Sequence, residues 1–253
     1  MRIATYNLWN SESGMPDREQ YIVDEIMNVD ADVICLQEVL SKAHAERIAD
    51  KTEYKHCFFA HYINSEEGLC ILSNCPFEKR ESWLAVANAV SCSVKWDERI
   101  VAIVNLHLPW DSVIEREKQI VDIIKNINEE KYDYVFLAGD FNCNDTSDVH
   151  RFLTGDCLLK GQEANPVWYD LAAAYAELTH TEPESTLNFR ENPRFLNNTI
   201  ELNARFDRIL LRNTYPVEFP VLKKCSVFGK TIFRDIKLSA SDHYGVAVDV
   251  ELR

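Results

Sequence analysis

The sequence predicts a layered α/β protein with mixed sheets and helices on the outside. Short apolar runs that fit buried strands recur along the 253 residues, and segments with helical spacing of apolar side chains separate several of them. Strands and helices alternate near the start, a series of strands follows, and the alternation then returns, which is typical of an α/β sandwich. No repeat with a period of about 20 to 50 residues is present, and no Gly-, Ser- or Pro-rich linker divides the chain. We therefore expect a single domain over residues 1–253.

The predicted strands are short. The run Val33-Ile34-Cys35-Leu36 is flanked by acids and fits a strand that is buried on both faces. The segment 99–106 is a similar apolar run that ends in Asn-Leu. The full set of expected strands covers residues 2–8, 32–38, 54–62, 68–74, 83–95, 99–106, 132–138, 206–211, 217–227 and 245–252.

Four segments are predicted to be helical. In residues 16–29 a proline stands near the first turn, and apolar side chains recur on one face. Further along, the isoleucines between residues 120 and 127 follow i, i+3, i+4, i+7 spacing, with Asp111 or Ser112 as the expected N-cap. Two shorter helices are expected at residues 41–50 and 145–153.

Charge and the chain's first residues limit the class of protein. Lys and Arg number 27 against 41 Asp and Glu, so the net charge is -14 at pH 7. This charge argues against non-specific binding along duplex nucleic acid and against anionic membranes, although a small basic pocket for one phosphate or a strand end stays open. No apolar run approaches the roughly 18 residues of a spanning helix, and no signal peptide is evident. We expect a cytoplasmic protein with no membrane association and no obligate protein partner.

The eight cysteines are expected to be buried free thiols rather than disulfides. Most of them stand inside apolar, strand-like runs, and the chain lacks a Cys-x-x-Cys pair for zinc or redox chemistry. Free cysteine packs as a small apolar residue in such positions.

Polar residues stand at six places where an apolar strand is predicted to end. Such positions open onto the edge of a sheet, where layered α/β proteins build their sites. The six segments are Tyr6-Asn7-Leu8-Trp9, Leu36-Gln37-Glu38-Val39, Asn105-Leu106-His107-Leu108, Gly139-Asp140-Phe141-Asn142, Phe206-Asp207-Arg208-Ile209 and Ser241-Asp242-His243-Tyr244.

The fourth segment is the strongest of the six. A buried strand leads through a glycine to Asp140 and Asn142, whose side chains would point the same way, so that one could position what the other deprotonates. Taken singly, the other segments have ordinary structural explanations: a turn residue at Asn7, a helix-start acid at Glu38, a core histidine at His107, a salt bridge at Asp207 and a chance Asp-His pair at residues 242–243.

Together, these oxygen-rich residues with few nitrogens favour Mg²⁺, with Mn²⁺ able to replace it, over zinc. Sites of this kind bind the metal through one or two carboxylates and through phosphate oxygens of the substrate. A serine hydrolase is disfavoured because no Gly-x-Ser-x-Gly segment is present. The glycine-rich phosphate loops of common nucleotide-binding folds are absent too.

In order and over essentially the whole chain, the six segments resemble those of the endonuclease/exonuclease/phosphatase superfamily. The resemblance implies a four-layered α/β sandwich of two mixed β-sheets flanked by helices. It also implies Mg²⁺-dependent hydrolysis of phosphoesters. In that reading Glu38 is the principal metal ligand, Asp242 supports the metal or its water shell, and Asn7 lies beside them.

The resemblance also assigns catalytic roles. Asp140 would orient and deprotonate the attacking water, and Asn142 would hold that water or the phosphate. His107 and His243 would donate hydrogen bonds to the phosphate oxygens as charge grows in the transition state. Asp207 would orient His243, as a carboxylate partner does for a catalytic imidazole.

Within the superfamily, the C-terminal part looks most like the 5′-tyrosyl-DNA phosphodiesterase branch. Its likeness rests on residues 206–212 and 241–245, and it implies a single-stranded DNA 5′ end as substrate, with Phe206, Arg208 and Thr186 as substrate-binding residues. Leu187 stands where many members carry Trp, and Asn144 stands where that branch tends to have Arg. Whether Arg190, Arg194 and Arg205 line a substrate groove or a solvated face is left open.

Two other functions stay open. One is a phosphatase or phosphodiesterase that acts on a small-molecule, inositol or lipid phosphate. The other is a binding module that keeps the fold without the chemistry, which the complete set of site residues disfavours.

Overall fold

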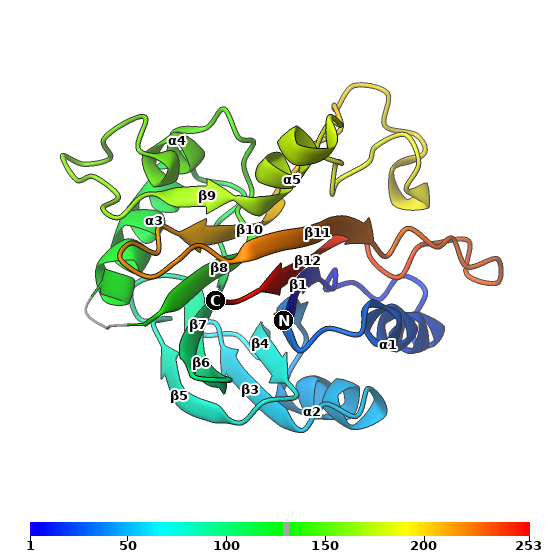
Figure 1. Cartoon of the computed structure of the whole chain (residues 1–253). Helices are drawn as coiled ribbons and strands as arrows, with labels where there is room; N and C mark the ends of the chain where they lie inside the picture. Colours follow the sequence, from blue (N-terminus) through cyan, green and yellow to red (C-terminus); the bar gives the residue numbers. More distant parts are fainter. Residues whose placement is uncertain (129–131) are drawn as a thin grey trace.

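Two β-sheets pack face to face in the computed structural model, which describes residues 1–128 and 132–253 (Figure 1). The strand order is β11-β12-β1-β2-β4-β3 in the first sheet and β5-β6-β7-β8-β10-β9 in the second. Each sheet contains one parallel pair, β1 with β2 and β7 with β8, and its other pairs are antiparallel. Both sheets are therefore mixed, as expected.

The strands of the first sheet are β1 (Arg2–Asn7), β2 (Val33–Val39), β3 (His56–His61), β4 (Gly68–Ser73), β11 (Val221–Phe228) and β12 (Gly245–Glu251). The strands of the second sheet are β5 (Phe77–Ser82), β6 (Ala89–Trp96), β7 (Arg99–His107), β8 (Tyr134–Asp140), β9 (Trp168–Asp170) and β10 (Asp207–Arg212).

Helices cover the outer faces of both sheets. The first sheet packs against α1 (Asp17–Val29) and α2 (Lys42–Lys51), which share one apolar cluster with β1 and β2. The second sheet packs against α3 (Val113–Asn128) and α4 (Asp148–Thr154), and a third cluster fills the space between the sheets. The four layers of the predicted sandwich are confirmed (Figure 1).

Local chemistry places the helix starts. The hydroxyls of Ser41, Ser112 and Ser147 each accept a hydrogen bond from the backbone N–H three residues on, which satisfies a donor that the first turn leaves free. Ser112, rather than Asp111, is thus the N-cap of α3.

One predicted strand was wrong. Residues 83–95 were expected to be continuous, but β5 ends at Ser82 and β6 begins at Ala89, with a turn between them. Leu84 and Ala87 are buried in this turn, so an apolar turn had the composition of a strand. The strand expected at 217–227 begins only at Val221, because Pro220 has no N–H to donate to a neighbouring strand.

The sequence reading also missed four elements: β5, β9, α5 (Leu171–Thr179) and the 3-10 turn Pro193–Phe195. For α5 a signal was present, because Asp170 caps an alanine-rich run by accepting from the N–H groups of Ala172 and Ala173. All eight cysteines are free thiols, but only four of them are buried and the other four are partly exposed. No helix within residues 1–128 and 132–253 has the length and apolar character needed to cross a membrane.

Candidate active site

Three of the predicted residues form one row across neighbouring strands of the second sheet. His107 ends β7, Asp140 ends β8 and Asp207 begins β10, and the strand register pairs Asp140 with both of the others. Because β7 and β8 are parallel while β10 runs the opposite way, all three residues reach the same edge of the sheet. Strand register alone therefore assembles an imidazole and two carboxylates.

Asn7 connects this row to the first sheet. It ends β1 and is fully buried. Its side-chain amide donates to Glu38 Oε1 at 3.0 Å and to Asp140 Oδ2 at 3.1 Å. Its backbone carbonyl accepts from the Ser241 hydroxyl at 2.7 Å. One amide group thus bridges carboxylates that belong to different sheets.

Glu38 is directed toward the cleft by an irregularity of β2. The pairing of β2 with β4 shifts between Leu36 and Val39, and Glu38 has a left-handed φ of 54°. A bulge of this kind re-aims a side chain. The second carboxylate oxygen of Glu38 accepts from the backbone N–H of Asn10 at 2.7 Å.

Asp140 is held by a tight approach of β8 to β7. A Cβ on Gly139 would lie 2.0 Å from the backbone oxygen of Leu106, so only glycine fits before Asp140. Asn142 returns to the same carboxylate, with its backbone N–H 2.8 Å from Oδ1 and its amide nitrogen 3.3 Å from Oδ2. The predicted convergence of Asp140 and Asn142 is present.

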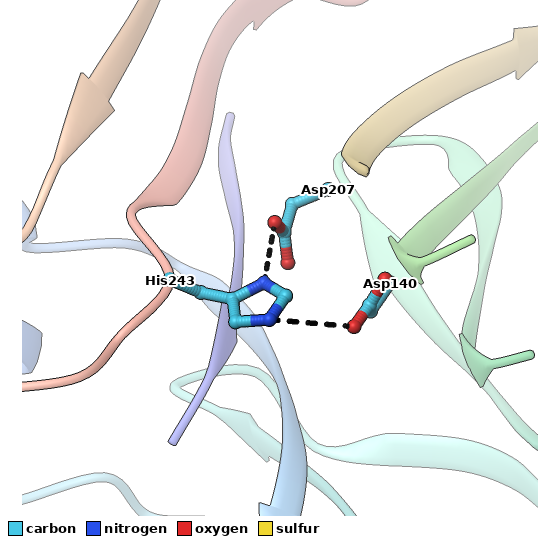
Figure 2. A group of neighbouring side chains, drawn as sticks. All are labelled: Asp140, Asp207 and His243. Carbon is cyan, nitrogen blue, oxygen red and sulfur yellow. Dashed lines mark hydrogen bonds and ion pairs between the residues drawn. The ribbon is translucent and has the colours of Figure 1, made fainter. Parts of the chain in front are cut away.

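His243 lies between two buried acids (Figure 2). Its Nδ1 is 2.9 Å from Asp207 Oδ2, and its Nε2 is 3.9 Å from Asp140 Oδ2. Burial alone would lower the pKa of His243, but the charges of Asp207 and Asp140 outweigh it and raise that pKa well above its usual value. The two carboxylates therefore favour the protonated form of the ring, which pairs with Asp207 and faces Asp140.

His107 approaches the same carboxylates from the other side. Its Nε2 lies 3.6 Å from Asp140 Oδ2 and 3.9 Å from Glu38 Oε1. Its Nδ1 pairs with the Tyr62 hydroxyl at 2.8 Å. The six predicted segments thus supply side chains to one site at the edge where the two sheets meet.

The sequence pattern of the Endonuclease/Exonuclease/phosphatase family matches residues 4–243. The chain belongs to this family. Its members are usually hydrolases that act on phosphoesters. No curated protein matched the sequence.

Solved structures share this fold at low sequence identity. A Danio rerio TDP2 complexed with a single-strand DNA product is 20% identical, with a TM-score of 0.77 over 98% of this chain and 97% of that one. A Caenorhabditis elegans TDP2 is 16% identical, with the same TM-score over 99% of this chain and 74% of that one. A protein of unknown function from Enterococcus faecalis V583 is 19% identical, with a TM-score of 0.75 over the full length of both chains.

The carboxylates of the site offer two places for a cation. Asp140, Asp207 and His243 each bring a ligand atom within 4.8 Å of the others, so this group could hold a metal ion. His243 in its protonated form, however, already balances the two acids there. At the second place, burial raises the pKa of Asp242 to about 6 and the charge of Glu38 adds to that rise, although His243 opposes it.

The second place is Glu38 with Asp242. Over residues 1–128 and 132–253, the Asp242 carboxylate accepts no hydrogen bond, and the Glu38 side chain is partly exposed. The charge of Glu38 acts on Asp242, and the two carboxylates offer hard oxygen atoms of the kind that divalent cations bind.

Two residues expected to contact substrate lie behind the cleft, and these expectations are corrected. Arg208 is fully buried and donates to the carbonyl of Cys143 at 2.7 Å. Thr186 is also fully buried, and its hydroxyl accepts from the N–H groups of Phe206 and Asp207, both at 3.1 Å. Thr186 holds the backbone at Asp207, Arg208 holds the backbone at Cys143, and neither side chain is exposed to a ligand.

The remaining residues of that region differ among themselves. Phe206 packs on an apolar cluster with Leu187 and Phe189 and stays partly exposed. Arg205 pairs with Asp170 at 2.6 Å, and Arg190 donates to backbone carbonyls of its own loop. Arg190 and Arg194 are both exposed, but within residues 1–128 and 132–253 only Arg194 of these three has a guanidinium with no hydrogen bond or ion pair.

The sequence reading missed several supporting residues. Arg18 is fully buried and donates only to backbone carbonyls, those of Leu8, Trp9, Ser11, Ser13 and Ala240. It fixes the segment after β1 and ties it to the segment before His243. Tyr62 stands just past β3 and would have been found by the strand-end rule that found the others. No comparable signal marks Arg18, since it is one charged residue of an ordinary amphipathic helix.

Proposed function

We propose that the chain is a metal-dependent phosphodiesterase, with Mg²⁺ as the cofactor and Mn²⁺ able to replace it. The observation that supports it most is the convergence of Asn7 and His243, from opposite ends of the chain, on Asp140: the Asn7 amide donates to Asp140 Oδ2 at 3.1 Å, and His243 Nε2 lies 3.9 Å from the same oxygen. Carboxylates and imidazoles in this arrangement suit in-line displacement at phosphorus, which needs positioning and charge neutralisation more than covalent help.

The proposed cofactor site is Glu38 with Asp242. When bound there, the metal would act as a Lewis acid toward the phosphate oxygens. Asn7 keeps the Glu38 carboxylate in place through its amide.

The chain's own residues would perform the rest of the reaction. Asp140 would accept a proton from the attacking water, and Asn142 would orient that water or the phosphate. His243, held as an imidazolium by Asp207, would donate to a phosphate oxygen on which negative charge grows, and His107 would do so from the opposite side.

We propose a DNA 5′ end, 5′-phosphotyrosyl or related, as the substrate. The TDP2 structure with a single-strand DNA product has the same fold, and the partly exposed Phe206 offers an apolar surface to a terminal base or tyrosine. Arg190, Arg205 and Arg208 are engaged with the protein, and the chain carries a charge of -14. These facts favour contact with a few nucleotides at the end of a strand over contact with a long stretch of the DNA backbone. They suit a small phosphodiester equally well, and this is the second candidate substrate.

The experiment is a hydrolysis assay with and without Mg²⁺. The substrates are a 5′-phosphotyrosyl oligonucleotide, an aryl phosphodiester, an abasic-site duplex, an inositol phosphate and a sphingolipid. Asp140→Asn is expected to lower kcat by about 10²- to 10⁴-fold, because the general base is lost.

Asp97→Asn is the matched control, because Asp97 lies in the turn between β6 and β7 with a left-handed backbone that Asn tolerates. Equal rates for the Asp140→Asn and wild-type proteins would refute the catalytic role. Absence of both turnover and Mg²⁺-induced thermal stabilisation would favour a binding module.

A further inference from the structure

The exposed Arg194 and the partly buried Trp9 form a pair beside the candidate active site. The guanidinium carbon of Arg194 lies 5.4 Å from the centre of the Trp9 ring and 5.8 Å from that of Phe195. Within residues 1–128 and 132–253, the Arg194 guanidinium donates no hydrogen bond and forms no ion pair. Its hydrogen-bonding edge is therefore available to a ligand.

Both members of the pair are fixed to the site by short connections. The backbone N–H of Trp9 donates to Asn7 Oδ1 at 2.9 Å, and Asn7 is the residue that bridges Glu38 and Asp140. The buried guanidinium of Arg18 lies 4.7 Å from the Trp9 ring and donates to the Trp9 carbonyl. Trp9 is thus a rigid platform two residues from the site.

Arg194 is anchored from the opposite end of the chain. Its backbone N–H donates to the side chain of Asn192 at 3.0 Å. The Asn192 amide donates in turn to the carbonyls of Ser241 and Asp242, at 3.0 and 3.2 Å. Asn192 is buried, so this connection is firm. Arg194 also lines an open groove of about 570 Å³ formed by residues 193–201.

We propose that Arg194, stacked on Trp9, binds a second phosphate of the substrate, next to the phosphate that is hydrolysed. This inference rests on the proposed function. A guanidinium that stacks on an aromatic face keeps its planar edge free for two parallel hydrogen bonds to phosphate. In a chain with a charge of -14, an anionic substrate needs such a local cation.

The test compares two esters that differ by one phosphate: thymidine 5′-(4-nitrophenyl phosphate) and the same ester with a 3′-phosphate. The wild-type protein is expected to have a KM about tenfold lower for the 3′-phosphorylated ester. Arg194→Ala should reduce that preference to less than about twofold, and Arg194→Lys should restore part of it, since the charge stays but the planar edge is lost.

Trp9 is tested as a positioning residue. Trp9→Leu should raise the KM of the 3′-phosphorylated ester and leave its kcat within about twofold, and Trp9→Phe should rescue the KM because the stacking surface returns. Arg234→Ala is the matched control, since Arg234 is an exposed arginine of the loop that follows β11. Thermal melting checks that each variant is folded.

A binding measurement separates this inference from the hydrolytic function. Calorimetry on the metal-free protein compares thymidine 3′,5′-bisphosphate with thymidine 5′-monophosphate. If the wild-type protein binds the bisphosphate more tightly and Arg194→Ala abolishes that difference, the phosphate site is supported even where neither ester is hydrolysed. Absence of hydrolysis in that case would refute only the proposed hydrolytic function. A wild-type protein without the preference, or an Arg194→Ala protein that keeps it, overturns the assignment of Arg194.

Discussion

Two buried histidines, each close to a carboxylate, have opposite properties in this molecule. His243 lies between Asp207 and Asp140, and its pKa is raised well above the usual value. His44 of α2 lies 3.8 Å from Glu19 of α1, and burial lowers its pKa to about 4.

The difference comes from what else the acids bind. Glu19 is 3.0 Å from both Arg47 and Lys51, which lower its own pKa to about 2. These cations cancel the field that the carboxylate would exert on His44, so desolvation decides and the ring stays neutral. Within residues 1–128 and 132–253, no arginine or lysine forms an ion pair with Asp207, so its charge acts on His243. Proximity of an acid to a histidine therefore says little until the partners of that acid are known.

The largest expected effect is the difference in catalytic activity between variants of His243 and of His44. His243→Asn should lower kcat/KM on the aryl phosphodiester by about 10²- to 10³-fold, because a donor to the developing charge is lost. His44→Asn should change kcat/KM by less than about twofold. Steady-state kinetics on both variants measures the contrast, and similar losses in the two proteins would contradict it.

The next effect concerns stability and pH. His44 has a folded pKa of about 4, below the ordinary 6.5, so its contribution is complete above pH 6.5 and is lost as pH falls toward 4. The full loss amounts to about 3 kcal/mol in the free energy of unfolding. In the His44→Leu protein, this fall in the free energy of unfolding with falling pH should be absent. Denaturant unfolding at pH 7, 6, 5 and 4.5 compares the two proteins.

Of His44 and Glu19, only His44 is expected to change the free energy of unfolding between pH 6.5 and 4.5. Glu19 has a depressed pKa of about 2, so its contribution is present above the ordinary 4.5 and falls only as pH drops from there toward 2. Parallel pH profiles of the wild-type and His44→Leu proteins above pH 4.5 would show that the ring is not buried in its neutral form.

The smallest effect concerns His107, whose Nδ1 pairs with the neutral hydroxyl of Tyr62. Tyr62→Phe removes the hydroxyl that pairs with His107 Nδ1 at 2.8 Å. One hydrogen bond is worth about 0.5–1.5 kcal/mol, so kcat should fall about two- to tenfold while KM stays constant. Tyr54→Phe is the control, since it removes a hydrogen bond to the Ala31 carbonyl far from the site. A larger effect of Tyr54→Phe on kcat would show that Tyr62 acts only through overall stability.

Apolar periodicity was sufficient to predict most of the fold. The isoleucines of α3 recur with the period of a helix, and the apolar runs of β2 and β7 fit a buried strand. Each of these segments therefore predicted one kind of element. The approach failed where an apolar segment was a turn, at residues 83–88, and where a short strand such as β9 depends on pairing with β10. Pairing between distant segments leaves no local periodicity.

The position of the site was predictable because strand ends collect at sheet edges. Asn7, Glu38 and Asp140 were named from that rule, and the structure brings them together. The roles of Arg208 and Thr186 were not predictable, since depth below the surface is a tertiary property: Arg208 follows Asp207 directly and Thr186 stands 21 residues before it, yet both side chains are fully buried. Arg18 escaped notice because its carbonyl partners carry no side-chain signature.

β12 lies between β11 and β1, so the strand of residues 245–251 joins β11 to the strand that begins at Arg2. Ser241 and His243 precede that strand directly and bind residues made more than two hundred codons and about thirty-five codons earlier, Asn7 and Asp207. Synthesis from residue 1 onward therefore produces Asn7, Glu38 and Asp140 long before the candidate site can form, because Ser241 and His243 must be added first.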